Sequence, residues 1–320
     1  MSFVLPVVLP MGLPGEEDLP DLIPRAFLEL ETLSGSLSVF PEEPDLKTTF
    51  ETFDKASDHP QFAEHWRVGG SSRQHWFIIA ESMVRFDESL DDDCSYDISI
   101  DYESAFRPFL LCGNIAKPGA LKIAEGVVFV DGEYTRTSEG FYTEFEVASE
   151  VSRTRAWPPV TELEIGQVWN WANSLPGFGR GIGEGPIGRA LAALAHLAFS
   201  DFRQSGPMDL VWALLGLEAI YARGASGIGS QILEKAAVLL GAPENHKHFF
   251  AGLYDRRSRF LHGDVDLAFP GCDPVETQRH DSQHADSYYA ALAMLLATIQ
   301  QLVLRNEREV RFSYRLDGPS

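Results

Sequence analysis

The sequence predicts an α+β fold in two parts, a mainly β domain over residues 1–155 and a helical bundle over residues 160–310. Three observations predict it. A chain of 320 residues is longer than most single domains, which have about 100–200 residues. In the first part, apolar residues come in short runs separated by turn residues, as in strands. After Pro159 they recur at the spacing of helices.

The N-terminal part contains several candidate strands, after about 45 proline-rich residues that we expect to be irregular. In the last candidate, every second residue from Phe141 is Phe, Thr or Val, which is typical of a half-buried strand. Asp131-Gly132 is typical of a tight turn. The candidate strands are residues 36–40, 75–80, 96–100, 126–130 and 141–147.

The C-terminal part contains candidate helices that glycine and proline residues separate. They cover residues 161–175, 187–203, 207–223, 228–240, 244–262 and 282–305. The glycine-rich segment 178–185 lies between two of them. We expect a loop there and no phosphate site, because no strand leads into it and no Lys-Ser/Thr follows.

The net charge is −21 and the isoelectric point is about 4.7. A surface this acidic repels phosphate backbones at long range. The charge therefore disfavours non-specific coating of nucleic acid, and any contact with RNA or DNA requires a local basic pocket.

The cysteines and the hydropathy favour a soluble cytoplasmic protein that does not associate with membranes. Cys94, Cys112 and Cys272 are odd in number and widely spaced, as in a protein with reduced thiols, without a disulfide framework or a zinc site. The apolar N-terminus lacks the basic residues of a signal peptide. No uninterrupted apolar run reaches the roughly 18–20 residues of a membrane span.

Arg257 is the most informative residue of the bundle. On a helix over residues 249–262, at about 100° per residue, it lies near the middle of a broad apolar arc. A guanidinium in an apolar face is costly unless it is paired and hydrogen-bonded. Arg257 must therefore meet an acidic side chain, a partner subunit or a phosphate that it binds with two nitrogens.

Two partners for Arg257 are open. Glu218 lies within an apolar stripe of the candidate helix 207–223, so the two residues could pair across a helix–helix contact. The alternative is a ligand phosphate. His262 supports it, because Gly263 is expected to end the helix there and leave the imidazole in a frayed last turn near Arg257.

An arginine beside a histidine suits metal-free RNA cleavage. The imidazole can transfer protons near neutral pH, and the guanidinium stabilises charge that develops on the phosphoryl oxygens. Tyr254 and Ser258 lie on the line that leads to His262 and could orient a phosphate. A histidine at a helix end is more often a cap than a catalyst, so the pair alone does not decide the function.

The segment 253–263 resembles the Apea-like subgroup of HEPN domains, with Arg257 and His262 matching the Arg-x4–6-His signature. The subgroup also has helices similar to residues 214–221 and 230–241, and the resemblance covers about residues 190–305. It implies a helical bundle that forms a homodimer, in which the Arg and His of both protomers line one cleft.

The resemblance also implies an activity. Active members are metal-independent endoribonucleases, many of them in phage-defence or toxin systems. Arg257 would bind the scissile phosphate, and His262 would be the general acid or base. Ser258 is at the position where members of the family often have a polar residue after the Arg. Other members of the superfamily only bind nucleic acid or a protein partner.

We therefore expect a HEPN-type endoribonuclease with RNA as its substrate, no cofactor and no metal. Arg257 and His262 are its candidate catalytic residues, and Ser258, Arg256, Tyr254 and Glu218 its supporting residues. Arg256 belongs to a basic island in an acidic chain. The N-terminal domain is expected to sense a trigger or to block the cleft. A third possibility is that this acidic domain binds a basic protein partner and masks the RNA site. The alternative is a catalytically silent dimer that binds RNA or protein.

Rival metal sites are weaker. His280 and His284 have the i,i+4 spacing of a metal pair, but we expect His280 to precede the helix, and no third ligand is nearby.

Overall fold

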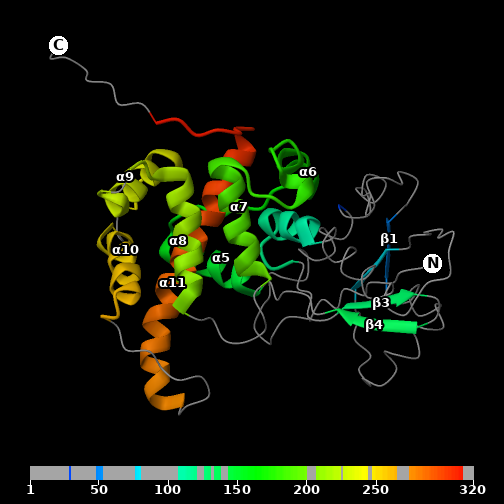
Figure 1. Ribbon diagram of the computed structural model, residues 1–320, viewed down its shortest axis with the longest axis horizontal. Coiled ribbons are helices and arrows are strands. Elements are labelled where there is room, and N and C mark those ends of the chain that lie inside the picture. The colour runs from blue at the N-terminus through cyan, green and yellow to red at the C-terminus, as the bar shows by residue number, and fades with distance from the viewer. Residues whose placement is uncertain are drawn as a thin grey trace. The chain divides into compact units, whose positions relative to one another are not determined.

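The computed structural model describes residue 29, four strands and several longer segments (Figure 1). The strands are β1 (Thr48–Thr52), β2 (Trp76–Ala80), β3 (Gly126–Val130) and β4 (Glu133–Thr137). The longer segments are residues 107–120, 143–199, 207–224, 226–243, 247–264 and 274–312.

The strands form two antiparallel pairs, β1 with β2 and β3 with β4. The predicted strands 75–80 and 126–130 are confirmed as β2 and β3. Val130 pairs with Glu133, so β3 and β4 are joined at the position of the predicted turn. The candidate strands 36–40 and 96–100 lie outside the described residues. That the N-terminal part is mainly β stays a prediction.

The predicted strand over residues 141–147 is wrong. Residues 143 onward belong to helix α5 (Thr143–Arg155), whose buried side chains include Phe145, Ala148 and Ser152. Their spacing of three and four is that of a helix face. Glutamates in the first turn and arginines in the last turn also favour the helix, because they complement its dipole. A further helix covers residues 107–116.

The C-terminal part that the structure describes is an all-helical bundle, as predicted. After α5 come α6 (Ile165–Asn173), the short helix η3 (Phe178–Arg180), α7 (Gly185–Ala198), α8 (Pro207–Tyr221), α9 (Ile228–Leu240), α10 (Lys247–Leu261) and α11 (Pro274–Leu304). The predicted helices agree with these except at their ends. Helix α11 begins at Pro274 and not at residue 282, with the proline at the position where it costs no hydrogen bond.

Helix α11 forms the centre of this bundle and packs most extensively against α8 (Figure 1). Gly216 of α8 allows the close approach, because a Cβ at this position would lie only 2.6 Å from Leu295 of α11. Helices α9 and α10 pack against each other and against both α8 and α11.

Of the helices that the structure describes, one is long and apolar enough to cross a membrane. It is the 21-residue segment His284–Leu304 of α11, with a mean hydropathy of 1.4. In the structure 83% of this apolar window is buried inside the protein. The position of α11 in the core therefore accounts for its composition.

The chain forms two compact units that alternate along the sequence. The first consists of Met1–Glu146, Glu162–Asn170 and Ala198–Phe202, and the second of Val147–Thr161, Trp171–Leu197 and Arg203–Ser320. The boundary predicted near residues 155–160 stays a prediction.

Cys112 is fully buried in the helix 107–116, and burial raises the pKa of its thiol far above the usual range. Because the thiolate is the reactive form, we expect Cys112 to resist alkylation in the folded protein. Iodoacetamide at pH 8 followed by peptide mass spectrometry should leave Cys112 unmodified, whereas the same treatment in urea should modify it. Equal labelling in both conditions would contradict the burial.

Candidate functional site

Helix α10 carries most of the predicted site residues, and aromatic contacts fix its position. Phe250 and Leu253 are buried on its inner face. The ring of Phe250 meets Trp157 edge-on at a centroid distance of 4.4 Å. The Trp157 indole nitrogen also donates to the carbonyl of Gly241, just after α9 (2.8 Å). Trp157 therefore ties the start of α10 to the end of α9.

Gly263 follows the C-cap of helix α10, as predicted, and its φ of +78° is in the left-handed region. The amide of Gly263 donates to Phe260 O (3.2 Å), and the amide of Asp264 donates to Arg259 O (2.8 Å). This pair of bonds is the Schellman motif. It places His262 at the C-cap of the helix, where the residue is exposed.

Three of the predicted residues come together between α8 and α10. Arg257 Nη2 lies 3.4 Å from Glu218 Oε1, and Arg257 Nη1 donates to the hydroxyl of Tyr254 (3.2 Å). The guanidinium carbon also lies 5.3 Å from the centre of the Tyr254 ring. The side chains of Arg257 and Glu218 are only 16% and 18% exposed. The pairing of Arg257 with Glu218 was one of the two alternatives that the sequence left open.

This cluster is incompletely satisfied. Among the described residues, Arg257 Nε and Glu218 Oε1 are both buried and have no hydrogen-bond partner. The ion pair is thus close enough for attraction but not aligned for a hydrogen bond. Burial raises the pKa of Glu218 above its ordinary value, and the Arg257 guanidinium offsets only part of this effect. The desolvation cost of the carboxylate therefore exceeds the attraction of the arginine.

His262 is not part of the cluster. His262 follows Arg257 by five residues, and on an ideal helix this separation places the two side chains about 140° apart. Within the described residues, its side chain makes no hydrogen bond or ion pair, and its amide donates to Ser258 O (3.0 Å). The imidazole is therefore accessible to a ligand or to a second protomer.

The other two supporting residues face different surroundings. Arg256 Nη1 donates to the hydroxyl of Ser287 on α11 (2.8 Å), so this guanidinium is held against the bundle. Ser258 lies on the side of α10 that faces α9, where it lines a groove together with Tyr254.

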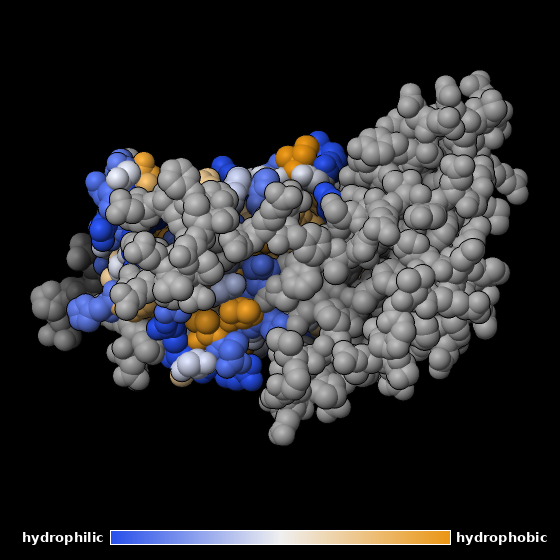
Figure 2. All heavy atoms as spheres, turned by 90° about the horizontal axis from the view of Figure 1, so that it is seen from below, coloured by the Kyte–Doolittle hydropathy of each residue, from blue (hydrophilic) through white to orange (hydrophobic). Residues whose placement is uncertain are grey.

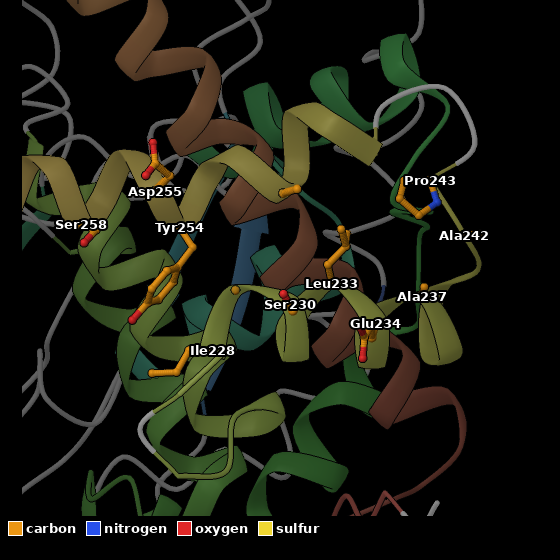
Figure 3. A pocket seen from close by; sticks show the side chains of 13 residues that line it. Ile228, Ser230, Leu233, Glu234, Ala237, Ala242, Pro243, Tyr254, Asp255 and Ser258 are labelled. Carbon is orange, nitrogen blue, oxygen red and sulfur yellow. The ribbon is translucent and has the colours of Figure 1, made fainter.

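The groove between α9 and α10 has a volume of about 850 Å³ (Figure 3). Tyr254 reaches from α10 towards Ile228 at the start of α9, and Glu234 and Ser230 stand on the α9 wall. The described residues that line it are Gly227, Ile228, Gly229, Ser230, Leu233, Glu234, Ala237, Ala242, Pro243, Ala251, Tyr254, Asp255 and Ser258.

The sequence interpretation missed this groove and its lining residues on α9. The signal that could have revealed it is the small side chains on the facing walls, such as Ala237 and Ala251. Gly229 is a further sign, because a Cβ there would lie 3.0 Å from Tyr254 Cβ.

The described residues contain no group of three or more His, Cys, Asp or Glu side chains placed to hold a metal ion. The expectation that His280 precedes the last helix is wrong, since α11 begins at Pro274.

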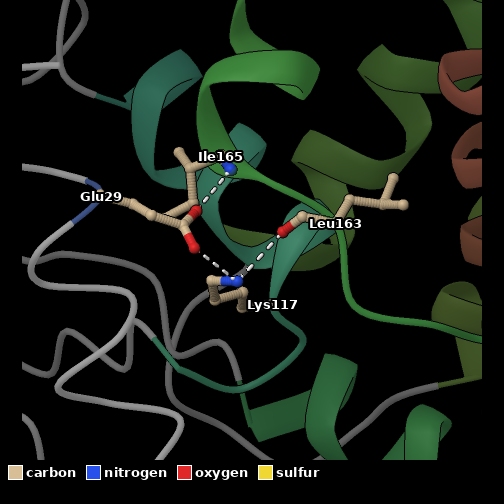
Figure 4. Close-up of polar contacts among 4 residues, drawn as sticks. All are labelled: Glu29, Lys117, Leu163 and Ile165. Atoms are coloured by element: carbon tan, nitrogen blue, oxygen red, sulfur yellow. Dashed lines mark hydrogen bonds and ion pairs between the residues drawn. The ribbon is translucent and has the colours of Figure 1, made fainter. Parts of the chain in front are cut away.

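A second buried charge pair lies in the first compact unit (Figure 4). Lys117 is 1% exposed, and its ammonium lies 2.8 Å from Glu29 Oε1 and donates to the carbonyl of Leu163 (3.1 Å). The other oxygen of Glu29 accepts the amide of Ile165, the first residue of α6 (2.8 Å). One carboxylate thus neutralises a buried lysine and caps a helix. Both functions are structural.

No protein-family model, no curated protein and no solved structure matches this chain.

The cluster on α8 and α10 contains one cationic group, the guanidinium of Arg257. Arg257 is held in place from two sides by Glu218 and Tyr254, and its Nε is buried and has no hydrogen-bond partner among the described residues. A phosphate offers the acceptor oxygens that a guanidinium binds best. The exposed imidazole of His262, one turn further along α10, adds a group that can transfer protons near neutral pH.

Proposed function

We propose that this chain is a metal-independent endoribonuclease of the HEPN type that acts on RNA in the cytoplasm, in a defence or toxin-like system. Arg257 and His262 carry the reaction, and the N-terminal part senses a trigger or binds a protein partner. The observation that supports this proposal most is the incomplete satisfaction of Arg257. Its guanidinium is mostly buried, yet Nε has no partner among the described residues.

Cleavage of RNA needs a positive charge that stabilises the phosphoryl oxygens, and it needs two proton transfers. The 2′-hydroxyl of RNA attacks the adjacent phosphorus and gives its proton to a base, while the P–O5′ bond breaks and an acid protonates the leaving oxygen. Arg257 stabilises the charge on the phosphoryl oxygens, and His262 acts as acid or base. A homodimer would supply two histidines, one for each proton transfer.

Exposed apolar side chains near the cluster support the homodimer. Leu215 lies one turn before Glu218 on α8 and is 38% exposed, and Leu261 lies one turn after Arg257 on α10 and is 49% exposed. Helix α8 is apolar on all sides, which is typical of a helix that is covered all round. On the face drawn in Figure 2, hydrophobic residues gather in small patches among hydrophilic ones. A second copy that covers α8 would bring two Arg257–His262 pairs together.

The test is cleavage of mixed RNA by the purified chain in EDTA. We expect His262→Ala to lower the cleavage rate by roughly 10²–10⁴-fold, the usual contribution of a general acid or base. Arg257→Ala should lower it by roughly 10²–10³-fold, the usual cost of losing a donor to the developing charge. Denaturing gels of a labelled RNA over time give the rates.

Two matched variants control for charge and folding. His248→Ala removes an exposed histidine from the same helix, and Arg189→Ala removes an exposed arginine from α7. Both should cleave like the unmodified chain. The proposal fails if cleavage is equal in the Arg257→Ala and His262→Ala variants and the unmodified chain, or if the unmodified chain cleaves no RNA.

A second candidate function is a silent dimer that binds RNA or protein. The Glu218–Arg257 ion pair favours it, because a guanidinium held by a carboxylate is less available to a phosphate. In that case the chain should bind RNA or a partner without cleaving it, and His262→Ala should leave binding unchanged. Filter binding of the uncleaved RNA separates the two functions.

A further inference from the structure

The groove between α9 and α10 has carboxylate and hydroxyl groups and no cationic side chain among the lining residues that the structure describes. Among the described residues that line it, the charged side chains are the carboxylates of Glu234 on α9 and Asp255 on α10. The remaining polar groups are the hydroxyls of Ser230, Tyr254 and Ser258. Such a groove disfavours a phosphate and favours a ligand rich in N–H donors.

The apolar part of the lining fits a flat apolar body. It includes Ile228, Leu233 and Ala237 of α9 and Ala251 of α10. Tyr254 also lines the groove (Figure 3). Aromatic side chains stack readily on the faces of nucleobases. The volume of about 850 Å³ is within the usual range of small-molecule sites, about 300–1,000 Å³.

Tyr254 connects the groove to the proposed cleavage site. Its ring lines the groove, and its hydroxyl accepts the hydrogen bond from Arg257. A nucleotide whose phosphate contacts Arg257 could therefore place its base in the groove, against the ring of Tyr254.

We propose that this groove binds a nucleobase with amino groups, guanine before the others, in the RNA strand that Arg257 holds; this inference rests on the proposed function. Guanine presents N1–H and N2–H₂ side by side, so one carboxylate can accept from both. Uracil presents one N–H between two carbonyl oxygens, which the carboxylates of Glu234 and Asp255 would repel. The groove thus selects the base, and Arg257 binds the phosphate.

The test is calorimetric binding of neutral nucleosides to the full chain. Guanosine and inosine differ only in the 2-amino group, and uridine lacks any amino group. We expect guanosine to bind about 5- to 150-fold more tightly than inosine, the discrimination typical of a bidentate contact, and uridine to bind most weakly. Glu234→Gln and Asp255→Asn test the two carboxylates, and at least one of them should remove the preference for guanosine over inosine.

Two further variants complete the test. Ala237→Trp fills the groove without changing the charge and should abolish nucleoside binding. Glu184→Gln changes an exposed carboxylate that does not line the groove and should bind guanosine like the unmodified chain. Equal binding of guanosine, inosine and uridine, or no binding at all, overturns the inference, as does binding that the groove variants leave unchanged.

The nucleoside test is independent of cleavage. If guanosine binds as expected but no RNA is cut, the groove proposal is supported and the proposed nuclease activity is contradicted. If RNA is cut through Arg257 and His262 but guanosine does not bind, the nuclease stands and the groove proposal fails.

Discussion

Glu29→Ala is expected to lower the free energy of unfolding by about 3–5 kcal/mol, the usual cost of removing one partner of a buried ion pair. The ammonium of Lys117 is 1% exposed, and Glu29 supplies the carboxylate within 2.8 Å of it. The change also removes the acceptor for the amide of Ile165 at the start of α6. Urea unfolding followed by tryptophan fluorescence measures the loss.

Two controls make this result specific. Glu29→Gln combined with Lys117→Met should be more stable than Glu29→Ala, because a buried pair can often be replaced by neutral groups at little cost. Glu184→Ala breaks the exposed pair of Glu184 with Arg180 and should cost at most about 1 kcal/mol. A Glu29→Ala loss no larger than that of Glu184→Ala would show that Lys117 does not depend on Glu29.

Arg257→Ala is expected to lower the free energy of unfolding by about 1–3 kcal/mol at pH 7, the usual cost of a buried group left without its partner. The variant leaves the Glu218 carboxylate, which is 18% exposed, without its cation. Adding Glu218→Gln should restore most of the stability, because the uncompensated charge is then gone. Thermal melts of the single and double variants give the comparison. Equal losses in both variants would contradict the coupling.

The pH dependence of Glu218→Gln alone follows from the raised pKa of Glu218. The folded protein binds this proton more readily than the unfolded chain does. The contribution of protonated Glu218 to the free energy of unfolding is therefore complete below the ordinary glutamate pKa, about 4.3. This contribution is lost as the pH rises through the raised pKa of the folded protein. At pH 7 the glutamine variant should thus be more stable than the unmodified chain, and the difference should vanish in acid. A variant that is less stable at pH 7 would show that the Glu218 charge supports the fold.

These experiments also bear on the two candidate functions. A buried carboxyl group that lowers stability is typical of a functional site, where stability is exchanged for activity. If Glu218 orients Arg257 for RNA, the glutamine variant should be more stable and cleave more slowly. If the pair only holds the bundle, the glutamine variant should be no more stable and should bind its partner normally.

Local spacing predicted helices α6 to α11 and gave Glu218 as one of two possible partners for Arg257. Each of these residues lies in the middle of an apolar face, so burial of the two faces brings the charges together. The end of α10 was equally predictable, because Gly263 takes a left-handed conformation that disfavours other residues.

The features that local spacing did not predict depend on other segments or on very short patterns. The alternation from Phe141 to Val147 is typical of a strand over seven residues. The buried residues Phe145, Ala148 and Ser152 of α5 instead have the spacing of a helix face. The sequence around Lys117 gives no sign that the distant Glu29 is its partner. The groove arises from the facing walls of two helices, which neither helix shows alone.

The alternation of the two compact units along the chain limits how this protein can be divided. The first unit ends at Glu146 but regains residues from 162 to 170 and from 198 to 202. A gene fragment that stops at residue 155 would lack Leu163 and Ile165, whose backbone groups bond to Lys117 and Glu29. Neither unit can therefore be transplanted into another protein by a single crossover, and recombination has to exchange the two together.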